Sequence, residues 1–173
     1  MTISTKRLGL AAVLAVALPL TACGSDTPES VTEAEASSET LTGAIPADSR
    51  FAAALEEAGL STLFEGPEPY TVLLPPDAAF PETLPEDKEE LASILTLHIL
   101  PGTILAEDIG AALDRKEGGS LTLPTYGGSD LTLERAEDGS LTVSAGGSPV
   151  RLTPGDATLE NGAIHRIDGL LTA

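Results

Sequence analysis

Apolar residues recur at helical spacing after residue 44. A first set consists of Phe51, Ala54, Leu55 and Ala58. Gly59 follows it, and because a glycine commonly stands just beyond the last helical turn, a helix ending there is predicted. A second apolar stripe consists of Leu91, Ile94, Leu95, His98 and Ile99. It predicts another helix, which opens at the acidic segment 85–87 and ends before Pro101.

Strand patterns occupy the centre and the last third of the chain. The unbroken run Tyr70–Leu74 predicts a buried strand that ends at Pro75-Pro76, because proline cannot donate to a sheet ladder. Later segments alternate apolar and polar residues with period two, over 121–123, 131–135, 141–143 and 150–152. A closing strand is expected over 163–171. A short strand is expected over 103–105 and a short helix over 107–113. Helices first and antiparallel strands later indicate the α+β class.

Two polar positions have the character of structural signals. Asp77 follows Pro75-Pro76 and precedes Ala78, Ala79 and Phe80, so it is expected to cap the start of a short helix. Asn161-Gly162 is expected to form a tight turn with positive φ before the closing strand.

The N-terminus has the pattern of a secretory signal. Lys6 and Arg7 precede an apolar run of about 13 residues, which is shorter than the ~20 residues of a spanning helix. Small residues then lead to Cys23, the only cysteine of the chain. The segment 20–23 (LTAC) resembles a lipobox, so residues 1–22 are expected to be a signal peptide and Cys23 to be acylated. An ordinary signal with an incidental cysteine is the alternative.

The chain is strongly acidic, with a formal net charge of −18. Without Lys6 and Arg7, seven basic residues remain against 27 acidic ones. Such a charge, with three Phe, two Tyr and no Trp, excludes nucleic-acid binding. Residues 24–43 hold five acidic residues, no basic residue and no aromatic one. We therefore expect residues 23–43 to be a lipidated cysteine with a disordered acidic tether, and residues 44–173 to be one domain.

Three segments resemble the signature sequences of the fasciclin domain family. They are 70–80 (YTVLLPPDAAF), 97–105 (LHILPGTIL) and 161–171 (NGAIHRIDGLL). The resemblance implies a domain in which N-terminal helices pack against a mostly antiparallel, twisted sheet or β-wedge. It also implies an extracellular protein that works by adhesion and binding. Pro76 replaces a usual threonine, and Leu97 replaces the tyrosine of a Tyr-His pair tied to integrin-dependent adhesion in animal members, so no integrin role is expected.

Two histidines are the candidate residues of a binding surface. His98 belongs to the second apolar stripe, where a packed, hydrogen-bonded histidine is the alternative to an exposed one. His165 lies in the closing strand, where alternation places it on the face opposite Arg166 and Asp168. That arrangement argues against a His–Asp catalytic pair. Two histidines and no further thiol also make a zinc site improbable on ligand arithmetic, and we expect no metal, no cofactor and no catalytic residue.

These observations predict an extracytoplasmic, membrane-anchored lipoprotein that acts in envelope adhesion or in binding a protein or polysaccharide. The lipid bilayer would be reached through Cys23, and Gly24 after it favours the outer membrane if the cell is Gram-negative. The alternative is a carrier or sensor of a small apolar ligand held between helices and sheet.

Overall fold

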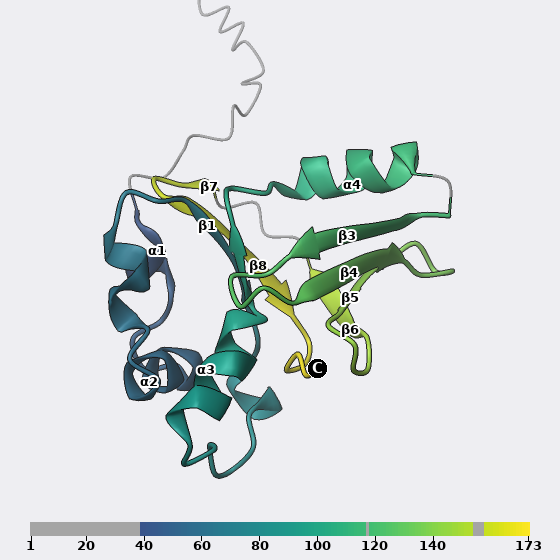
Figure 1. The fold of residues 1–173 in the computed structure, drawn as a ribbon. Coiled ribbons are helices and arrows are strands. Elements are labelled where there is room, and N and C mark those ends of the chain that lie inside the picture. Colours follow the sequence, from purple (N-terminus) through teal and green to yellow (C-terminus); the bar gives the residue numbers. More distant parts are fainter. Residues whose placement is uncertain (1–38, 117, 154–157) are drawn as a thin grey trace, which may run out of the picture. The chain divides into compact units, whose positions relative to one another are not determined.

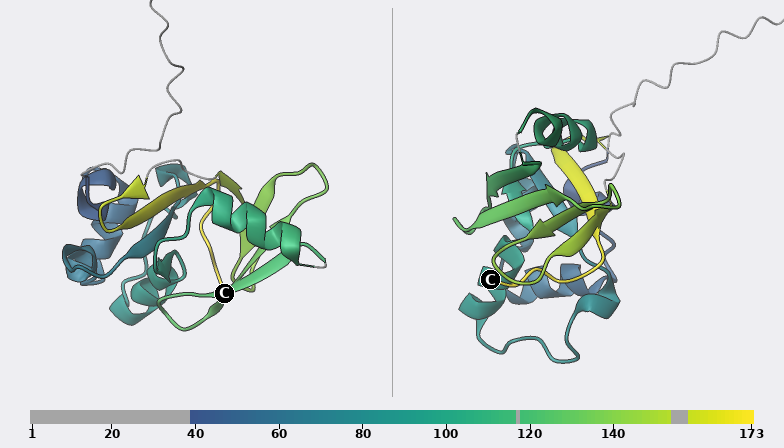
Figure 2. Two further views of the ribbon diagram at one scale, coloured as in Figure 1. Left: turned by 90° about the horizontal axis from the view of Figure 1, so that it is seen from above. Right: turned by 90° about the vertical axis from the view of Figure 1, so that its right-hand side faces the viewer.

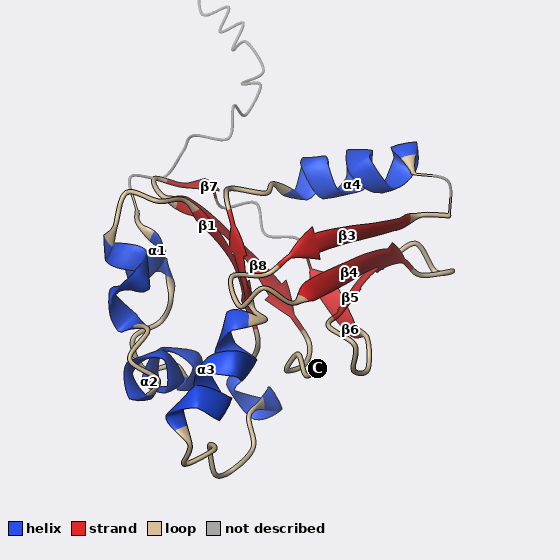
Figure 3. Ribbon diagram, viewed as in Figure 1, coloured by secondary structure: helices blue, strands red, loops and turns tan. Residues whose placement is uncertain are grey.

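The computed structural model describes residues 39–116, 118–153 and 158–173. In chain order the elements are α1 (Leu41–Ala44), α2 (Arg50–Glu57), the 3₁₀ helix η1 (Ser61–Glu65), β1 (Tyr70–Leu74), the 3₁₀ helix η2 (Asp77–Ala79), α3 (Lys88–Thr96), β2 (Ile99–Pro101), α4 (Ala106–Arg115), β3 (Ser120–Pro124), β4 (Asp130–Arg135), β5 (Leu141–Ser144), β6 (Val150–Thr153), β7 (Thr158–Leu159) and β8 (Gly162–Ile167) (Figure 1). The helices lie in the first two thirds of the domain, where β1 and β2 lie between them, and only strands follow α4, which confirms the predicted α+β class (Figure 3).

The strands form one sheet in the order β2-β1-β8-β6-β5-β4-β3, and β7 pairs with β8. β1 and β8 run parallel, with Tyr70 opposite Gly162 and Leu74 opposite Arg166. The other strand pairs of the described part are antiparallel. The two ends of the sheet approach each other, because the N–H of Tyr126 donates a 2.7 Å hydrogen bond to the carbonyl of Ile99 in β2. The result is a nearly closed, wedge-like sheet (Figure 2).

Two clusters of buried apolar side chains hold this sheet. The first joins α2 and α3 to β1 through residues such as Phe51, Leu95 and Val72. The second joins α4 to the antiparallel strands through residues such as Ile109 and Leu133. The helices accordingly lie in two places, with α1, α2 and α3 beside β1 and α4 along β3 (Figure 1). Burial of these side chains is the main source of stability.

The second predicted helix is shorter than its apolar stripe indicated. α3 ends at Thr96, and the strand that follows is Ile99–Pro101 rather than 103–105. Ile99 and Leu100 pair with Val72 and Thr71 of β1, so their backbone groups complete the sheet. A short apolar run fits a buried strand as well as a helix, which is why periodicity alone misplaced this boundary.

The closing strand is also shorter than predicted, since β8 ends at Ile167 and not at 171. The residues after it leave the sheet and contact other parts of the domain. The carbonyl of Thr172 accepts a hydrogen bond from the N–H of Gly147, and the N–H of Leu171 donates to His98. The apolar side chain of Leu171 is therefore buried outside the sheet, which the sequence alone did not distinguish from a longer strand.

The fold begins before residue 44. Leu41 is fully buried, and its N–H donates a 2.7 Å hydrogen bond to the side chain of Asn161. Glu39 also takes part, because its carbonyl accepts a bond from the N–H of Glu160. The expected tether, 23–43, thus extends too far, because the domain already begins at residues 39–41. No local pattern indicated this, since Leu41 is a single apolar residue in a polar stretch. Cys23 and the expected signal peptide lie outside the described residues.

No helix of the described residues is long and apolar enough to cross a membrane.

Candidate binding site

A pocket lies at the carboxyl ends of the two parallel strands. β1 runs into Pro75 and Pro76, while β8 ends with Arg166 and Ile167, so the two strands open to the same edge. The loop between α1 and α2 completes the wall, and the cavity of about 260 Å³ is lined by Pro46, Asp48, Ser49, Leu74, Pro75, Pro76, Asp77, Arg166 and Ile167. Carboxyl ends of parallel strands are a common location of binding crevices.

Asp77 lies in this pocket, but it does not cap its own segment as predicted. Asp77 is the first residue of η2 and its side chain makes no cap there. Its Oδ1 accepts a 2.8 Å hydrogen bond from the N–H of Arg50 at the start of α2. Ser49 caps the same helix through the N–H of Ala52. Asp77 therefore caps α2, because the N–H that it accepts from belongs to Arg50, 27 positions earlier in the chain. Local sequence patterns cannot indicate such a distant partner.

Arg166 and Asp48 carry the remaining charge of this pocket. Both side chains are exposed, and neither forms an ion pair with another described residue. Sequence reasoning placed Arg166 on the face opposite His165 but assigned no role to it. The pocket draws on residues 46–49, 74–77 and 166–167, which only the tertiary fold brings together.

His98 is a core residue, not part of an exposed surface. It is fully buried in the turn between α3 and β2, with its ring edge-on to Phe51 at 6.1 Å. Its Nε2 accepts a 3.0 Å hydrogen bond from the N–H of Leu171, so Nδ1 carries the proton and donates to the carbonyl of Ile94 at 2.9 Å. Burial lowers the pKa of His98 to about 4, against a smaller opposite effect of the Ile94 carbonyl.

His165 is likewise fully buried, on β8. Its Nε2 donates a 2.8 Å hydrogen bond to the carbonyl of Ile104, in the segment that leads into α4. Arg166, which alternation placed on the opposite face of the strand, is exposed. Both histidines therefore connect distant segments, and neither is accessible as a binding surface, which corrects their candidacy.

The turn predicted at Asn161-Gly162 lies one residue earlier, because Asn161 belongs to the turn between β7 and β8 and Gly162 is the first residue of β8. Asn161 uses both ends of its amide, because Oδ1 accepts from the N–H of Leu41 and Nδ2 donates to the carbonyl of Phe64 at 2.9 Å. Gly162 has φ of 154° and lies directly against β1, where a Cβ would stand 1.9 Å from the carbonyl oxygen of Tyr70. Only glycine permits this parallel approach.

An aromatic cluster that sequence reasoning missed reaches the surface at the β3–β4 turn. Tyr126 is 46% exposed and meets the ring of Tyr70 edge-on at 5.8 Å, and Tyr70 in turn meets Phe64 at 5.9 Å. The hydroxyl of Tyr70 donates to Glu68 at 2.9 Å. Burial, followed by this bond, raises the pKa of Tyr70 to about 12.

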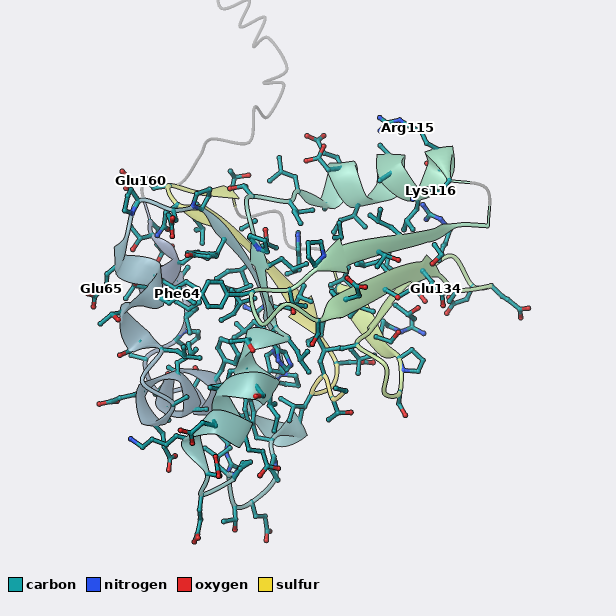
Figure 4. The ribbon with its side chains drawn as sticks, in the orientation of Figure 1. Phe64, Glu65, Arg115, Lys116, Glu134 and Glu160 are labelled. Atoms are coloured by element: carbon teal, nitrogen blue, oxygen red, sulfur yellow. The ribbon has the colours of Figure 1, made fainter. Side chains whose placement is uncertain are left out.

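Charged side chains cover the outside of the domain. At the start of α3, the exposed carboxylates Glu86, Glu89 and Glu90 form what we call the α3 acidic surface. Beside them Asp87 is the N-cap, and the N–H groups of Glu90 and Glu89 lower its pKa. Glu65 and Glu160 project from the side of α1 and β7, whereas Arg115, Lys116 and Glu134 lie at the far end of α4 and β4 (Figure 4). Among the described residues, no group of three or more His, Cys, Asp or Glu is placed to hold a metal ion.

The sequence model of the fasciclin domain matches residues 47–173. The chain belongs to the fasciclin domain family. A solved FAS1 domain pair from the insect cell adhesion molecule fasciclin I has the same fold, with a TM-score of 0.58 and 21% identity over 70% of this chain and 43% of that one. The match supports the wedge-like arrangement of helices and sheet described above.

Three relatives of the fasciclin domain are similar in sequence. A fasciclin-like arabinogalactan protein of Phaeosphaeria nodorum is 31% identical over 78% of this chain and 40% of its own length. A transforming growth factor-beta-induced protein of Sus scrofa is 37% identical over 69% of this chain and 17% of its own. A protein of Synechocystis is 28% identical over 85% of this chain and 75% of its own. The chain thus spans less than half of the first two relatives. Fasciclin domain proteins are implicated in cell adhesion.

Proposed function

We propose that this fasciclin domain is a lipid-anchored, extracytoplasmic adhesion module that binds a protein or polysaccharide of the cell envelope or matrix. The observation that carries the proposal is the family match over 47–173. Two further observations support it. Both histidines are buried and hydrogen-bonded in the core, and the exposed surface is dominated by carboxylates. Recognition would therefore use the outside of a rigid domain.

The anchor in this proposal is acylated Cys23. The chain between Cys23 and Glu39 is polar and acidic, so it would hold the domain away from a bilayer without binding to it. About 16 residues span roughly 22 Å as a flexible coil. The outer membrane is the expected site in a Gram-negative cell.

The anchor is tested by replacing the thiol that would carry the lipid. Cells that express the wild-type chain or Cys23→Ser are labelled with an alkyne analogue of palmitate and fractionated. We expect label in the wild type and none in the variant. Equal labelling of both proteins would contradict the anchor.

The adhesion role is tested with the full Cys23→Ser chain, purified in mild detergent and added to isolated envelopes. Saturable retention is expected, because exposed carboxylates favour basic or cation-bridged partners. Loss of retention in EDTA would assign bridging to divalent cations. Retention that does not saturate would contradict a specific partner. The proposal includes no enzymatic activity, since the hydrogen bonds of His98 and His165 leave neither imidazole at a surface where it could act as a base.

A second candidate function is the carriage of a small apolar ligand. A cavity of about 430 Å³ among α1, α2 and η1 supports it, with Ile45, Ala52 and Phe64 in its wall. This cavity lies among helical segments, whereas Phe51 and Leu95 fill the space between helices and sheet. Native mass spectrometry of the protein purified from its own cells would detect a bound lipid or pigment, and a mass equal to the acylated polypeptide alone would exclude this function.

A further inference from the structure

The pocket at the carboxyl ends of β1 and β8 holds charged groups that the fold does not use. Oδ1 of Asp77 accepts a hydrogen bond from the N–H of Arg50, which leaves Oδ2 available. The hydroxyl of Ser49 is used within the fold, since it donates to the carbonyl of Pro46 and accepts from the N–H of Ala52. The available groups are therefore the Arg166 guanidinium, the Asp48 carboxylate and one oxygen of Asp77.

Arg166 is the one basic residue among those that line this pocket. Only seven basic residues follow Cys23, against 27 acidic ones. Two of the seven, Arg135 and Arg151, form ion pairs with Asp114 and Asp138 at 3.1 Å. Arg166 instead lines the pocket and forms no ion pair with another described residue. Its five N–H donors are therefore open to a ligand. A guanidinium in this state matches the two oxygens of a carboxylate.

The two carboxylates of the same pocket favour a ligand group of opposite charge. A ligand that carried only an anion would meet Arg166 but would also be repelled by Asp48 and Asp77. A ligand that carried only a cation would satisfy the carboxylates and meet repulsion from Arg166. Both kinds of group are satisfied together by a ligand with an ammonium and a carboxylate a few ångströms apart.

We propose that this pocket binds the zwitterionic ammonium–carboxylate group of an α-amino acid. Arg166 would hold the carboxylate, and Asp48 with the free oxygen of Asp77 would hold the ammonium. The volume agrees, because a cavity of about 260 Å³ is far larger than the space that one water needs, and alanine has only six heavy atoms. Pro46, Pro75 and Pro76 supply fixed walls that lose little entropy on binding. The site shares no residue with the α3 acidic surface and does not depend on the lipid anchor.

Binding is measured by saturation-transfer NMR on the full chain in detergent micelles, with three small probes. Alanine carries both charges, N-acetylalanine only the carboxylate and alaninamide only the ammonium. We expect alanine to bind about tenfold or more tightly than either one-charge probe, because each lost ionic hydrogen bond leaves a pocket charge unpaired. Equal binding of N-acetylalanine would overturn the proposal in favour of a simple anion site, and no binding of alanine would overturn it outright.

Two variants test the assigned residues. Arg166→Gln and Asp48→Asn should each weaken alanine binding about tenfold or more. The matched controls are Arg115→Gln and Asp130→Asn, which change exposed residues of α4 and β4 outside the pocket. Thermal unfolding by circular dichroism should give the same midpoint for all four variants. Unchanged alanine binding in Arg166→Gln would overturn the proposal.

A last probe, compared with alanine, distinguishes a free amino acid from the same group on a peptide. A short peptide whose side chain ends in a carbon with both ammonium and carboxylate presents the same chemistry on a larger molecule. Binding equal to that of alanine would assign the site to such peptides, and loss of binding would assign it to free amino acids. Either result retains the zwitterion as the recognised group.

Discussion

The imidazole of His98 accepts a hydrogen bond from the backbone N–H of Leu171, 73 residues away, at 3.0 Å. This contact ties the last residues of the chain to the turn between α3 and β2. Because Nδ1 of the same ring donates to Ile94, the histidine can fill both roles only as the neutral molecule. The resemblance to fasciclin domains placed His98 in a signature segment, and the structure gives it a physical task in the core.

Stability should therefore fall in mild acid. Burial lowers the pKa of folded His98 to about 4, below the ordinary value of 6.5, so the unfolded chain binds the proton first. The contribution of the neutral ring is fully present above pH 6.5 and is lost as the pH falls toward 4, by roughly 3 kcal/mol. Urea unfolding across this range measures it. His98→Gln should be less stable at neutral pH but should show less of this decline, and an identical pH dependence in both proteins would contradict the assignment.

Asn161→Asp should destabilise the domain by about 2 kcal/mol. The substitution keeps the acceptor for Leu41 but removes the N–H that Phe64 needs, and places a carboxylate oxygen against a carbonyl. Chemical denaturation reports the loss. Asp130→Asn, the opposite exchange at an exposed position of β4, is the control and should change stability little. A neutral effect of Asn161→Asp would show that the amide bridge contributes nothing.

Gly162→Ala should cost about 3 kcal/mol or more, because its Cβ would overlap the Tyr70 carbonyl at 1.9 Å and force β1 and β8 apart. Gly110→Ala is the matched control. Gly110 lies within α4 with no atom within 4 Å of a Cβ, so alanine there should stabilise by up to about 1 kcal/mol. Thermal unfolding of the pair should move the midpoint in opposite directions, and a shared direction would contradict the close parallel approach.

Asp77→Ala should destabilise the protein by about 1 kcal/mol through the start of α2, not through η2. Amide hydrogen exchange distinguishes the two, since the N–H of Arg50 should lose protection while the N–H of Phe80, bonded to the Asp77 backbone, should keep it. The reverse pattern would restore Asp77 as the local cap that the sequence suggested.

Local patterns predicted the elements that local forces define. The run Tyr70–Leu74 is a fully buried strand, and Gly59 adopts φ of 74° just beyond α2. The segment 97–100 was wrongly predicted as the end of a helix, because the backbone partners of Ile99–Pro101 lie in β1 and only the tertiary fold supplies them. Leu41 was missed for a related reason, since a single apolar residue has no periodicity.

The candidate site depended even more on the fold. Asn161 and Gly162 are recognisable because a turn has local chemistry. The pocket of Asp48, Asp77 and Arg166 joins three distant segments through the parallel pairing of β1 and β8, which alternation cannot reveal. The histidines were visible in the sequence, but their burial follows from packing against Phe51 and the segment that contains Ile104.

The α3 acidic surface gives the adhesion proposal its most direct test. The full Cys23→Ser chain is titrated onto isolated envelopes at about 50 and 500 mM NaCl, since contacts between exposed charges weaken as salt shortens the Debye length. The triple variant Glu86→Gln, Glu89→Gln, Glu90→Gln is compared with Glu107→Gln, Glu134→Gln, Glu137→Gln, which removes as many exposed charges elsewhere. We predict saturable binding whose affinity falls in high salt. The affinity should also fall about fivefold in the α3 variant and stay unchanged in the other triple variant. Binding indifferent to salt and to both variants would contradict the account.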